Sequence, residues 1–430
     1  MNKYFIKLGT AVTSAAMLVS SFVVPALAVD VEISGNGANS DNNATVVTDS
    51  NTTVNQTNYA NITNDVNVDA NTGHNDANNN TGGDVSIDTG DANANVDIAN
   101  TANANIAQVD ACCPKDINVT ISDNGADSDN DANVVANTTV NLDQDNTAKI
   151  KNKVDVDLDT GHNDANNNTG GNVTITTGDA AANGGVVITN TVNKNVASVG
   201  SGQNGGGSLS VWISGNGANS NNTANVIVNS TTNVSQTNYA NIKNDVDVDL
   251  NTGHNDANNN TGGDVSIDTG DATAQVDISN LANFNWADVD ACGCIFDASI
   301  KIKGNGAHSD NDAFVALLSR VWVDQDNTYD CSRRRGGQGV DLFGEHGRRH
   351  HKDCNEVDVD LDTGHNDANN NTQDGEPEIL TGDASADVIV DTTANKNIFG
   401  DADFDFEFPE LDLGEGSSSA LLLWLLAIFS

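Results

Sequence analysis

The chain has 430 residues, of which 61 are acidic and 18 are basic, so its formal net charge is −43. Such a polyanion repels nucleic acid and excludes it as a general partner, whereas it attracts divalent cations and basic surfaces. Large aliphatic and aromatic residues are scarce, and the alternative to a fold is a disordered acidic polymer.

The first 28 residues have the layout of a secretory signal peptide. Lys3 and Lys7 precede an apolar run that ends at Ala26-Leu27-Ala28, and leaders of this kind are removed on export. We expect cleavage after Ala28. The sequence therefore predicts a bacterial protein that is secreted, extracellular or held at the cell surface.

Four tandem repeats follow the leader. The decapeptide TGHNDANNNT stands at 72–81, 160–169, 252–261 and 363–372. Units one and three share QTNYANI, and units two and four share DQDNT, so an ancestral pair was duplicated as a pair. The expected boundaries are unit one at 29–113, unit two at 114–199, a flexible Gly/Ser linker at 200–209, unit three at 210–294 and unit four at 295–400.

Apolar and polar residues alternate strictly along 44–70, 132–158 and 224–250. Alternation predicts half-buried strands, and the enrichment in Val, Ile and Thr agrees. Because strands usually have about 3–10 residues, we expect each run to fold back several times within its own unit. The predicted fold is all-β, with tandem β-solenoid-like repeat units that contain Asn and Gln ladders.

The inward-facing parity of these runs also carries amide side chains. Buried amides are costly unless they are hydrogen-bonded, and equivalent amides stacked about 4.8 Å apart donate to one another. We expect the decapeptide to form a corner at Gly73, the alternative being an exposed Asn/Gly loop. The predicted ladder residues are Gln56, Asn58, Asn64, Gln144, Asn146, Asn152, Gln236, Asn238 and Asn244.

The pattern of Gln-x-x-x-Ala, Gly-x-Asn-x-Ala and alternating Val/Ile strands resembles the repeats of curlin, the subunit of a bacterial functional-amyloid fibre. The resemblance covers most of residues 31–400. It implies a strand–turn–strand solenoid with internal Gln and Asn ladders, and it suggests fibre formation. The sequence departs from the family at Gly73-His74-Asn75, where one residue separates Gly and Asn and curlin has two.

Closely spaced carboxylates in the DVDVDLD runs repel one another, and calcium, which takes oxygen ligands, would relieve this repulsion. No EF-hand or calcium β-roll motif is present, so we expect diffuse calcium binding and no other cofactor. The residues expected to gather calcium are Asp155, Asp157, Asp159, Asp245, Asp247 and Asp249.

The decapeptide also supplies one histidine per unit, at His74, His162, His254 and His365. If the units pack in register, the four rings line up and offer nitrogen ligands to a transition metal. The alternative, which we favour because no ligand pair has metal spacing, is a set of exposed turn residues.

Unit four contains a basic insertion between Cys331 and Cys354. A disulfide between these cysteines would close it as a finger, and we expect the finger to dock on an anionic surface or a neighbouring subunit. The alternative is a tolerated loop. The basic residues are Arg333, Arg334, Arg335, Arg348, Arg349 and Lys352.

The remaining cysteines, Cys112, Cys113, Cys292 and Cys294, lie at the joints inside each pair of units, and their pairing is left open. The C-terminus has two parts. Residues 401–416 alternate Phe with acids and predict a further strand, and 417–430 form a hydrophobic tail. Its ten apolar residues are too few to span a bilayer as a helix. The alternatives are a sorting tail, an interfacial anchor that contacts the membrane and a truncated membrane segment.

No nucleophile elbow, zinc-protease motif or phosphate loop occurs in the chain, so we do not expect an enzyme. The predicted function is structural, as a self-associating fibre or matrix subunit, because an open solenoid end is a sheet edge. One alternative is a surface adhesin that binds divalent cations or a glycan through its acidic faces. A second is an ice-binding solenoid, for which TITT at 174–177 is the candidate row.

Overall fold

The computed structural model describes residues 4–14, 17–23, 28–110, 116–182, 184–200, 208–289, 298–330, 354–372 and 377–400. All of them belong to the unit Met1–Gly400. The described residues form strands and turns, and none of them lies in a helix that is long and apolar enough to cross a membrane. The strand and the tail expected at 401–416 and 417–430 lie outside the described part.

Each repeat contributes one or two strands to each of four sheets, and we call each repeat a layer. Layer one consists of β3 (Val29–Ser34), β4 (Asp41–Asn71), β5 (Val85–Asp88) and β6 (Ala92–Asp110). Layer two consists of β7 (Asp116–Ser122), β8 (Asp129–Asp159), β9 (Val173–Thr176), β10 (Ala180–Ala181) and β11 (Val186–Gly200).

Layers three and four repeat the same order. Layer three consists of β12 (Ser208–Ser214), β13 (Asn221–Asn251), β14 (Val265–Asp268) and β15 (Ala272–Val289). Layer four consists of β16 (Ala298–Lys303), β17 (Asp310–Tyr329), β18 (Asn355–Asp362), β19 (Glu378–Leu380) and β20 (Ala384–Phe399). Its long strand is divided into β17 and β18 by the insertion.

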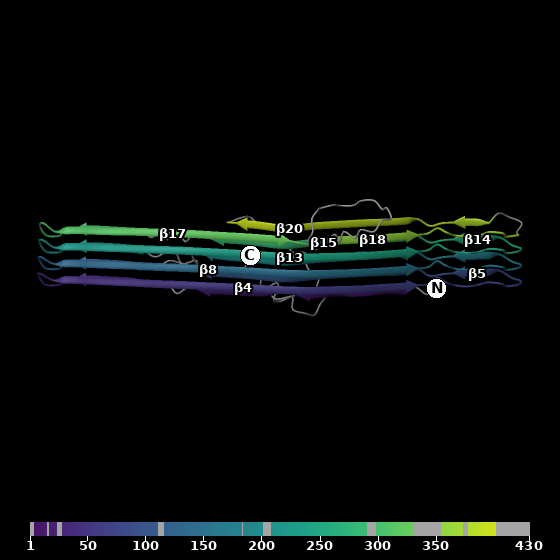
Figure 1. Ribbon diagram of the computed structural model, residues 1–430, viewed down its shortest axis with the longest axis horizontal. Coiled ribbons are helices and arrows are strands. Elements are labelled where there is room, and N and C mark those ends of the chain that lie inside the picture. Colours follow the sequence, from purple (N-terminus) through teal and green to yellow (C-terminus); the bar gives the residue numbers. More distant parts are fainter. Residues whose placement is uncertain are drawn as a thin grey trace. The chain divides into compact units, whose positions relative to one another are not determined.

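All sheets are parallel, and the residues that pair between neighbouring layers are equivalents of one another. Gln56 lies opposite Gln144, Gln144 opposite Gln236, and Gln236 opposite Gln325. Figure 1 shows the long strands β4, β8, β13 and β17 side by side in chain order. The all-β fold with buried amide ladders is therefore confirmed, and its sheets are parallel.

The expectation that each alternating run folds back within its unit is wrong. β4, β8 and β13 are single strands of 31 residues each. Strand length is usually limited by the length of the partner strand, and here each partner is a copy with the same length and the same alternation. One repeat therefore forms one layer, and the amides stack between repeats.

The core is a thin row of small apolar side chains from facing strands. Val154, Val156 and Leu158 of β8 pack with Val186 and Ile188 of β11, and equivalent residues of layers one and three extend this cluster. The first half of each long strand packs instead on the short strands β3, β7 and β12. Strict inward–outward alternation along β8 and β13 buries one parity almost completely.

The segment expected to be the leader also lies in strands. β1 (Tyr4–Ser14) and β2 (Met17–Val23) pair in parallel with β6, on the side of β6 opposite to β11. Cleavage after Ala28 stays a prediction.

Close stacking of the decapeptide turns makes a direct prediction about glycine. A Cβ added to Gly161 would overlap the backbone of Gly253 in the next layer. A Cβ added to Gly364 would lie 3.6 Å from a carboxylate oxygen of Asp362, which is an ordinary van der Waals contact. We expect Gly161→Ala to lower the free energy of unfolding by about 3 kcal/mol. Urea unfolding followed by circular dichroism measures this change. Gly364→Ala is the matched control, with an expected change within about 0.5 kcal/mol, and equal effects at both positions would contradict the stacking.

Candidate functional site

Three amide columns run through the layers between the long strands and the β6-type strands. Asn152 donates to Asn244 over 2.7 Å and accepts from Asn64 over 2.7 Å. Asn146 makes the equivalent bonds with Asn58 and Asn238, both of 3.1 Å. The side chains of Asn146 and Asn152 are buried, so the ladder supplies hydrogen bonds that water cannot.

The glutamine column runs in the opposite direction. Gln144 donates to Gln56 over 2.6 Å, and Gln236 donates to Gln144 over 2.8 Å. Each amide also donates to a carbonyl of the facing strand, as Gln144 does to Val196 over 3.0 Å. All nine amides named from the sequence thus belong to these columns. The hydrogen bonds along the columns join equivalent amides of different repeats and not amides of the same repeat.

Sequence reasoning missed a second set of amides, on the facing strands. Asn100 and Asn105 donate to Asn190 and Asn195 over 2.7 and 3.0 Å, and both also bond to the long-strand columns. Between them Asn103 adopts a left-handed conformation with φ of 62°. The signal was present in the sequence as Asn-x-x-Asn-x-Asn at 100–105, 190–195 and 280–285.

The four decapeptide histidines form a continuous stack. Neighbouring ring centroids lie 4.7–4.8 Å apart with interplanar angles of 4–12°. Every histidine has a φ between 55° and 58°, which turns the chain and places the rings above one another. The side chains remain between 39% and 73% exposed, so both readings made from the sequence hold in part: the rings are turn residues, and they are aligned.

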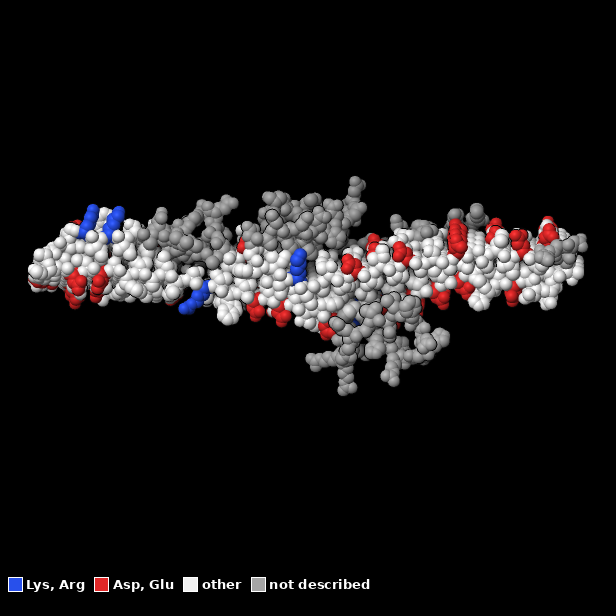
Figure 2. Space-filling view, turned by 90° about the horizontal axis from the view of Figure 1, so that it is seen from above, with Lys and Arg blue, Asp and Glu red and all other residues white. Residues whose placement is uncertain are grey.

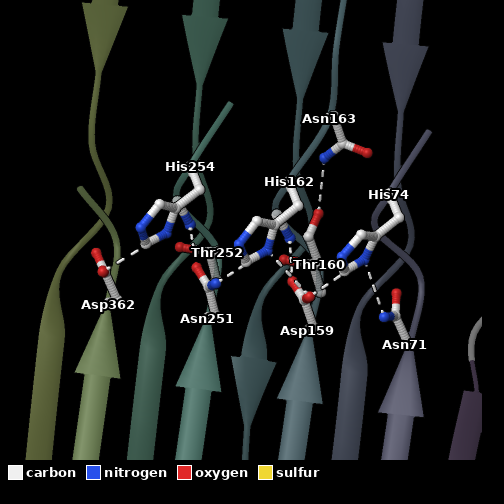
Figure 3. Close-up of polar contacts among 12 residues, drawn as sticks. Asn71, His74, Asp159, Thr160, His162, Asn163, Asn251, Thr252, His254 and Asp362 are labelled. Carbon is white, nitrogen blue, oxygen red and sulfur yellow. Dashed lines mark hydrogen bonds and ion pairs between the residues drawn. The ribbon is translucent and has the colours of Figure 1, made fainter. Parts of the chain in front are cut away.

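Acidic and amide side chains alternate beside this stack, in the order Asn71, Asp159, Asn251 and Asp362 (Figure 3). The buried carboxylate of Asp159 lies 3.3 Å from Nδ1 of His74 and 3.2 Å from Nδ1 of His162. Its other oxygen accepts the Gly161 N–H over 2.8 Å.

Asp362 is shared by the other two histidines in the same way. It lies 3.6 Å from Nδ1 of His254 and 3.1 Å from Nδ1 of His365. Each aspartate thus lies within 3.6 Å of the Nδ1 atoms of one pair of imidazoles. The Nδ1 atoms of His74 and His162 also face the amide nitrogens of Asn71 and Asn251, over 3.1 and 3.2 Å.

Each pair of imidazoles, together with its aspartate, provides three ligand atoms within 4.8 Å of one another. An imidazole binds a metal in its ring plane at about 2.0–2.1 Å. Within the two pairs the rings are nearly parallel and 4.7–4.8 Å apart, so their in-plane lone pairs run side by side and do not converge on one ion. The arrangement therefore does not favour a transition metal shared by the two imidazoles of a pair.

The acids expected to gather calcium also form columns. Asp155 lies opposite Asp247, and Asp157 opposite Asp249, whereas Asp159 lies opposite Asn251. Asp245 is different, because it lies opposite Lys153. On the face seen in Figure 2, acidic side chains gather in small groups and basic ones are few. Calcium binding to these columns stays a prediction.

Stacking shifts the acidity of these carboxyls. Partial burial raises the pKa of Asp157 and Asp249 from the ordinary value of 3.8, and neighbouring carboxylates raise it further. For Asp157 these neighbours include Asp69, and for Asp249 they include Asp360. Asp164 and Asp256 of the decapeptide have a raised pKa for the same two reasons.

The basic insertion lies outside the described residues, and so do Cys331 and the four cysteines at the joints. Cys354 is disulfide-bonded. Its pairing with Cys331, and the docking role of the six basic residues, stay predictions.

Comparisons with known proteins find nothing similar: no family model, no curated protein and no solved structure matches the chain. The geometry of the columns therefore carries the functional argument.

The amide columns predict a large cost for a small substitution. Asn152→Ala leaves several buried amide groups without a partner, so we expect the free energy of unfolding to fall by about 3 kcal/mol or more. Asn141→Ala is the control, because Asn141 belongs to an outward column of asparagines and should change stability by about 0.5 kcal/mol or less. Chemical denaturation of both variants measures the difference, and similar costs would contradict a buried ladder.

The raised pKa of Asp157 and Asp249 predicts a pH dependence. A carboxyl whose pKa is raised on folding destabilises the folded state above that pKa, and the penalty disappears as the pH falls through it towards 3.8. We expect Asp157→Asn/Asp249→Asn to melt at a higher temperature than the unmodified chain at pH 7–8. Thermal melts at stepped pH should show this gap closing in acid; a gap that widens in acid would refute the assignment.

Proposed function

We propose that the protein is an exported structural subunit, that its four layers are the turns of a β-solenoid, and that its copies assemble into a fibre or matrix. The order of the strands supports the solenoid, since each repeat passes through the four sheets in turn and the next repeat passes through them in the same order. Export rests on the leader at residues 1–28.

The observation that supports assembly is the incomplete burial of the core residues in the two outer layers, one and four. Val134 and Val226, in layers two and three, are fully buried, whereas the equivalent Val46 and Val315 are only partly buried. The long strands β4 and β17 each pair on one side with a described strand of the same sheet. Unpaired strand edges are templates for further strands, so both ends of the stack favour addition of another layer.

The resemblance to curlin supports the same proposal through the ladder residues. Stacked amides and parallel in-register strands are the features that stabilise fibrillar β-structure. Here the repeating layer is a whole repeat, so each added copy would contribute four layers at once.

Negative-stain microscopy and sedimentation velocity of the purified chain test this function. We expect filaments or a concentration-dependent series of larger species, with the circular dichroism of β-structure retained. A folded chain that stays monomeric at every concentration, pH and salt tested would exclude a role as an assembling subunit.

The second candidate is a surface adhesin that binds divalent cations. The observation that favours it is the stacking of acids opposite acids, as at Asp157 and Asp249, whose pKa is raised by partial burial and further by the neighbouring carboxylates. Calcium-dependent stabilisation without any assembly would select this function. Ice binding is less well supported, because Thr174 and Thr176 lie opposite Ser86 and Asp88 and no threonine row forms there.

A further inference from the structure

We propose that the two outer faces of the stack bind each other: the last layer of one copy seats on the first layer of a second copy, in the register already used between layers two and three. This inference rests on the proposed assembly and specifies its partner, contact surface and direction. The contact would continue an interface that occurs three times inside the chain.

Hydrogen-bond polarity favours a head-to-tail contact. In the column of Asn64, Asn152, Asn244 and Asn355, each amide nitrogen donates to the oxygen of the next layer, over 2.6–2.7 Å. The turn column from Asn75 to Asn366 has the same direction. In these two columns the last layer therefore ends as a donor and the first begins as an acceptor, whereas the glutamine column, in which Gln325 donates to Gln236, has the reverse polarity. Two last layers brought face to face would place like groups against each other in each of these columns, donors in the two asparagine columns and acceptors in the glutamine column.

The alternation of Asn and Asp between layers makes the contact between two copies specific. Odd layers carry Asn71 and Asn251 beside the histidine stack, and even layers carry Asp159 and Asp362. A first layer placed on a last layer puts Asn71 of the second copy beside His365. Inside the chain, Asn251 occupies the same position beside His162, with its amide nitrogen 3.2 Å from Nδ1. The Asn/Asp order continues without a break.

Glycine leaves room for this contact on both faces. Inside the stack, a Cβ on Gly253 would overlap Gly364, and one on Gly125 would overlap Gly37 and Ala38. At the outer faces the equivalent positions are Gly364 and Gly37. Among the residues that the structure describes, no backbone lies within 4 Å of a Cβ at either of them. A second copy bound in the same register would fill the space that glycine leaves at these two positions.

One strip of the first face is occupied in the full chain. β1 and β2 lie along β6 from Ala92 to Asp110, which is the edge that β20 of a second copy would take. This pairing shows that the β6 edge accepts a parallel strand. Removal of the leader on export frees the edge, so assembly is confined to the exported chain.

The seat also brings acids together across the junction. Asp360 of one copy would lie on Asp69 of the next, and Asp367 on Asp76, as Asp157 lies on Asp249 inside the chain. All four of these junction acids are exposed. Screening of such exposed charges weakens their repulsion, so we expect assembly to require calcium, added salt or a pH low enough to protonate carboxyls.

The experiment uses the chain as an exporting host releases it, after mass spectrometry has established whether the leader is gone. Gly364→Ala and Gly37→Ala each add one methyl group to one outer face. We expect both to unfold at the same urea concentration as the unmodified chain. The assembly assay contains about 5 mM CaCl2, which exceeds the dissociation constants of weak extracellular calcium sites. Under this condition each variant should need at least about tenfold more protein to assemble than the unmodified chain, because the added methyl group overlaps backbone at the junction.

Mixing the two variants is the decisive control. Gly37→Ala keeps a normal last face and Gly364→Ala keeps a normal first face, so an equimolar mixture should form two-copy complexes and no longer filaments. Sedimentation velocity distinguishes the two. Dimers on mixing support the inference. If the unmodified chain assembles and both variants assemble equally well, this seat is wrong while the structural function survives. If the unmodified chain never assembles, the proposed function fails and the seat fails with it.

Discussion

One constraint underlies the whole structure: each side chain lies about one strand spacing from its own equivalent in the next repeat. In-register parallel pairing imposes this on every position at once, from Gln56 on Gln144 to His74 on His162. A residue type is therefore tolerated only if it packs against or bonds to a copy of itself. Asparagine, glutamine, valine and glycine meet this condition, because amides donate to amides, β-branched side chains interlock, and glycine lets turns approach closely.

Charged residues meet the condition poorly, and this explains the chemistry of the surface. Partial burial raises the pKa of Asp157 and Asp249, and the carboxylates stacked beside them raise it further. The chain reduces this penalty in places. Lys153 lies opposite Asp65 and Asp245, although Glu356 of layer four then lies opposite Asp245. In the column of Asn71, Asp159, Asn251 and Asp362 the period of two layers is complete, so the duplication of repeats in pairs separates two carboxylates there that a period of one would stack. The acids that still meet remain candidates for diffuse calcium binding.

Much of the local structure could be predicted from the residues. Strict alternation identifies the strands and their inward face, and amides of inward parity imply a ladder, as found at Asn146 and Asn152. The strand length could not be obtained this way, because usual lengths describe sheets with unlike partners and not a stack of copies. The histidine stack could be predicted only on the condition that the units pack in register. The spacing of His74 and His162 in the sequence does not determine whether their turns lie above one another. The Asn100 and Asn103 columns were missed because they do not follow a period of two across the left-handed residue.

Composition and pattern alone thus establish an acidic, repetitive β-protein in which amides are buried, because these properties depend on charge count and on side-chain parity within one strand. The tertiary structure decides which strands are neighbours. A hydrogen bond from Asn64 to another asparagine is equally compatible with a partner in the same repeat or in the next one, and only the long, in-register strands select the latter. That choice determines where the acids and imidazoles meet, and it leaves the first and last layers as two different and complementary faces.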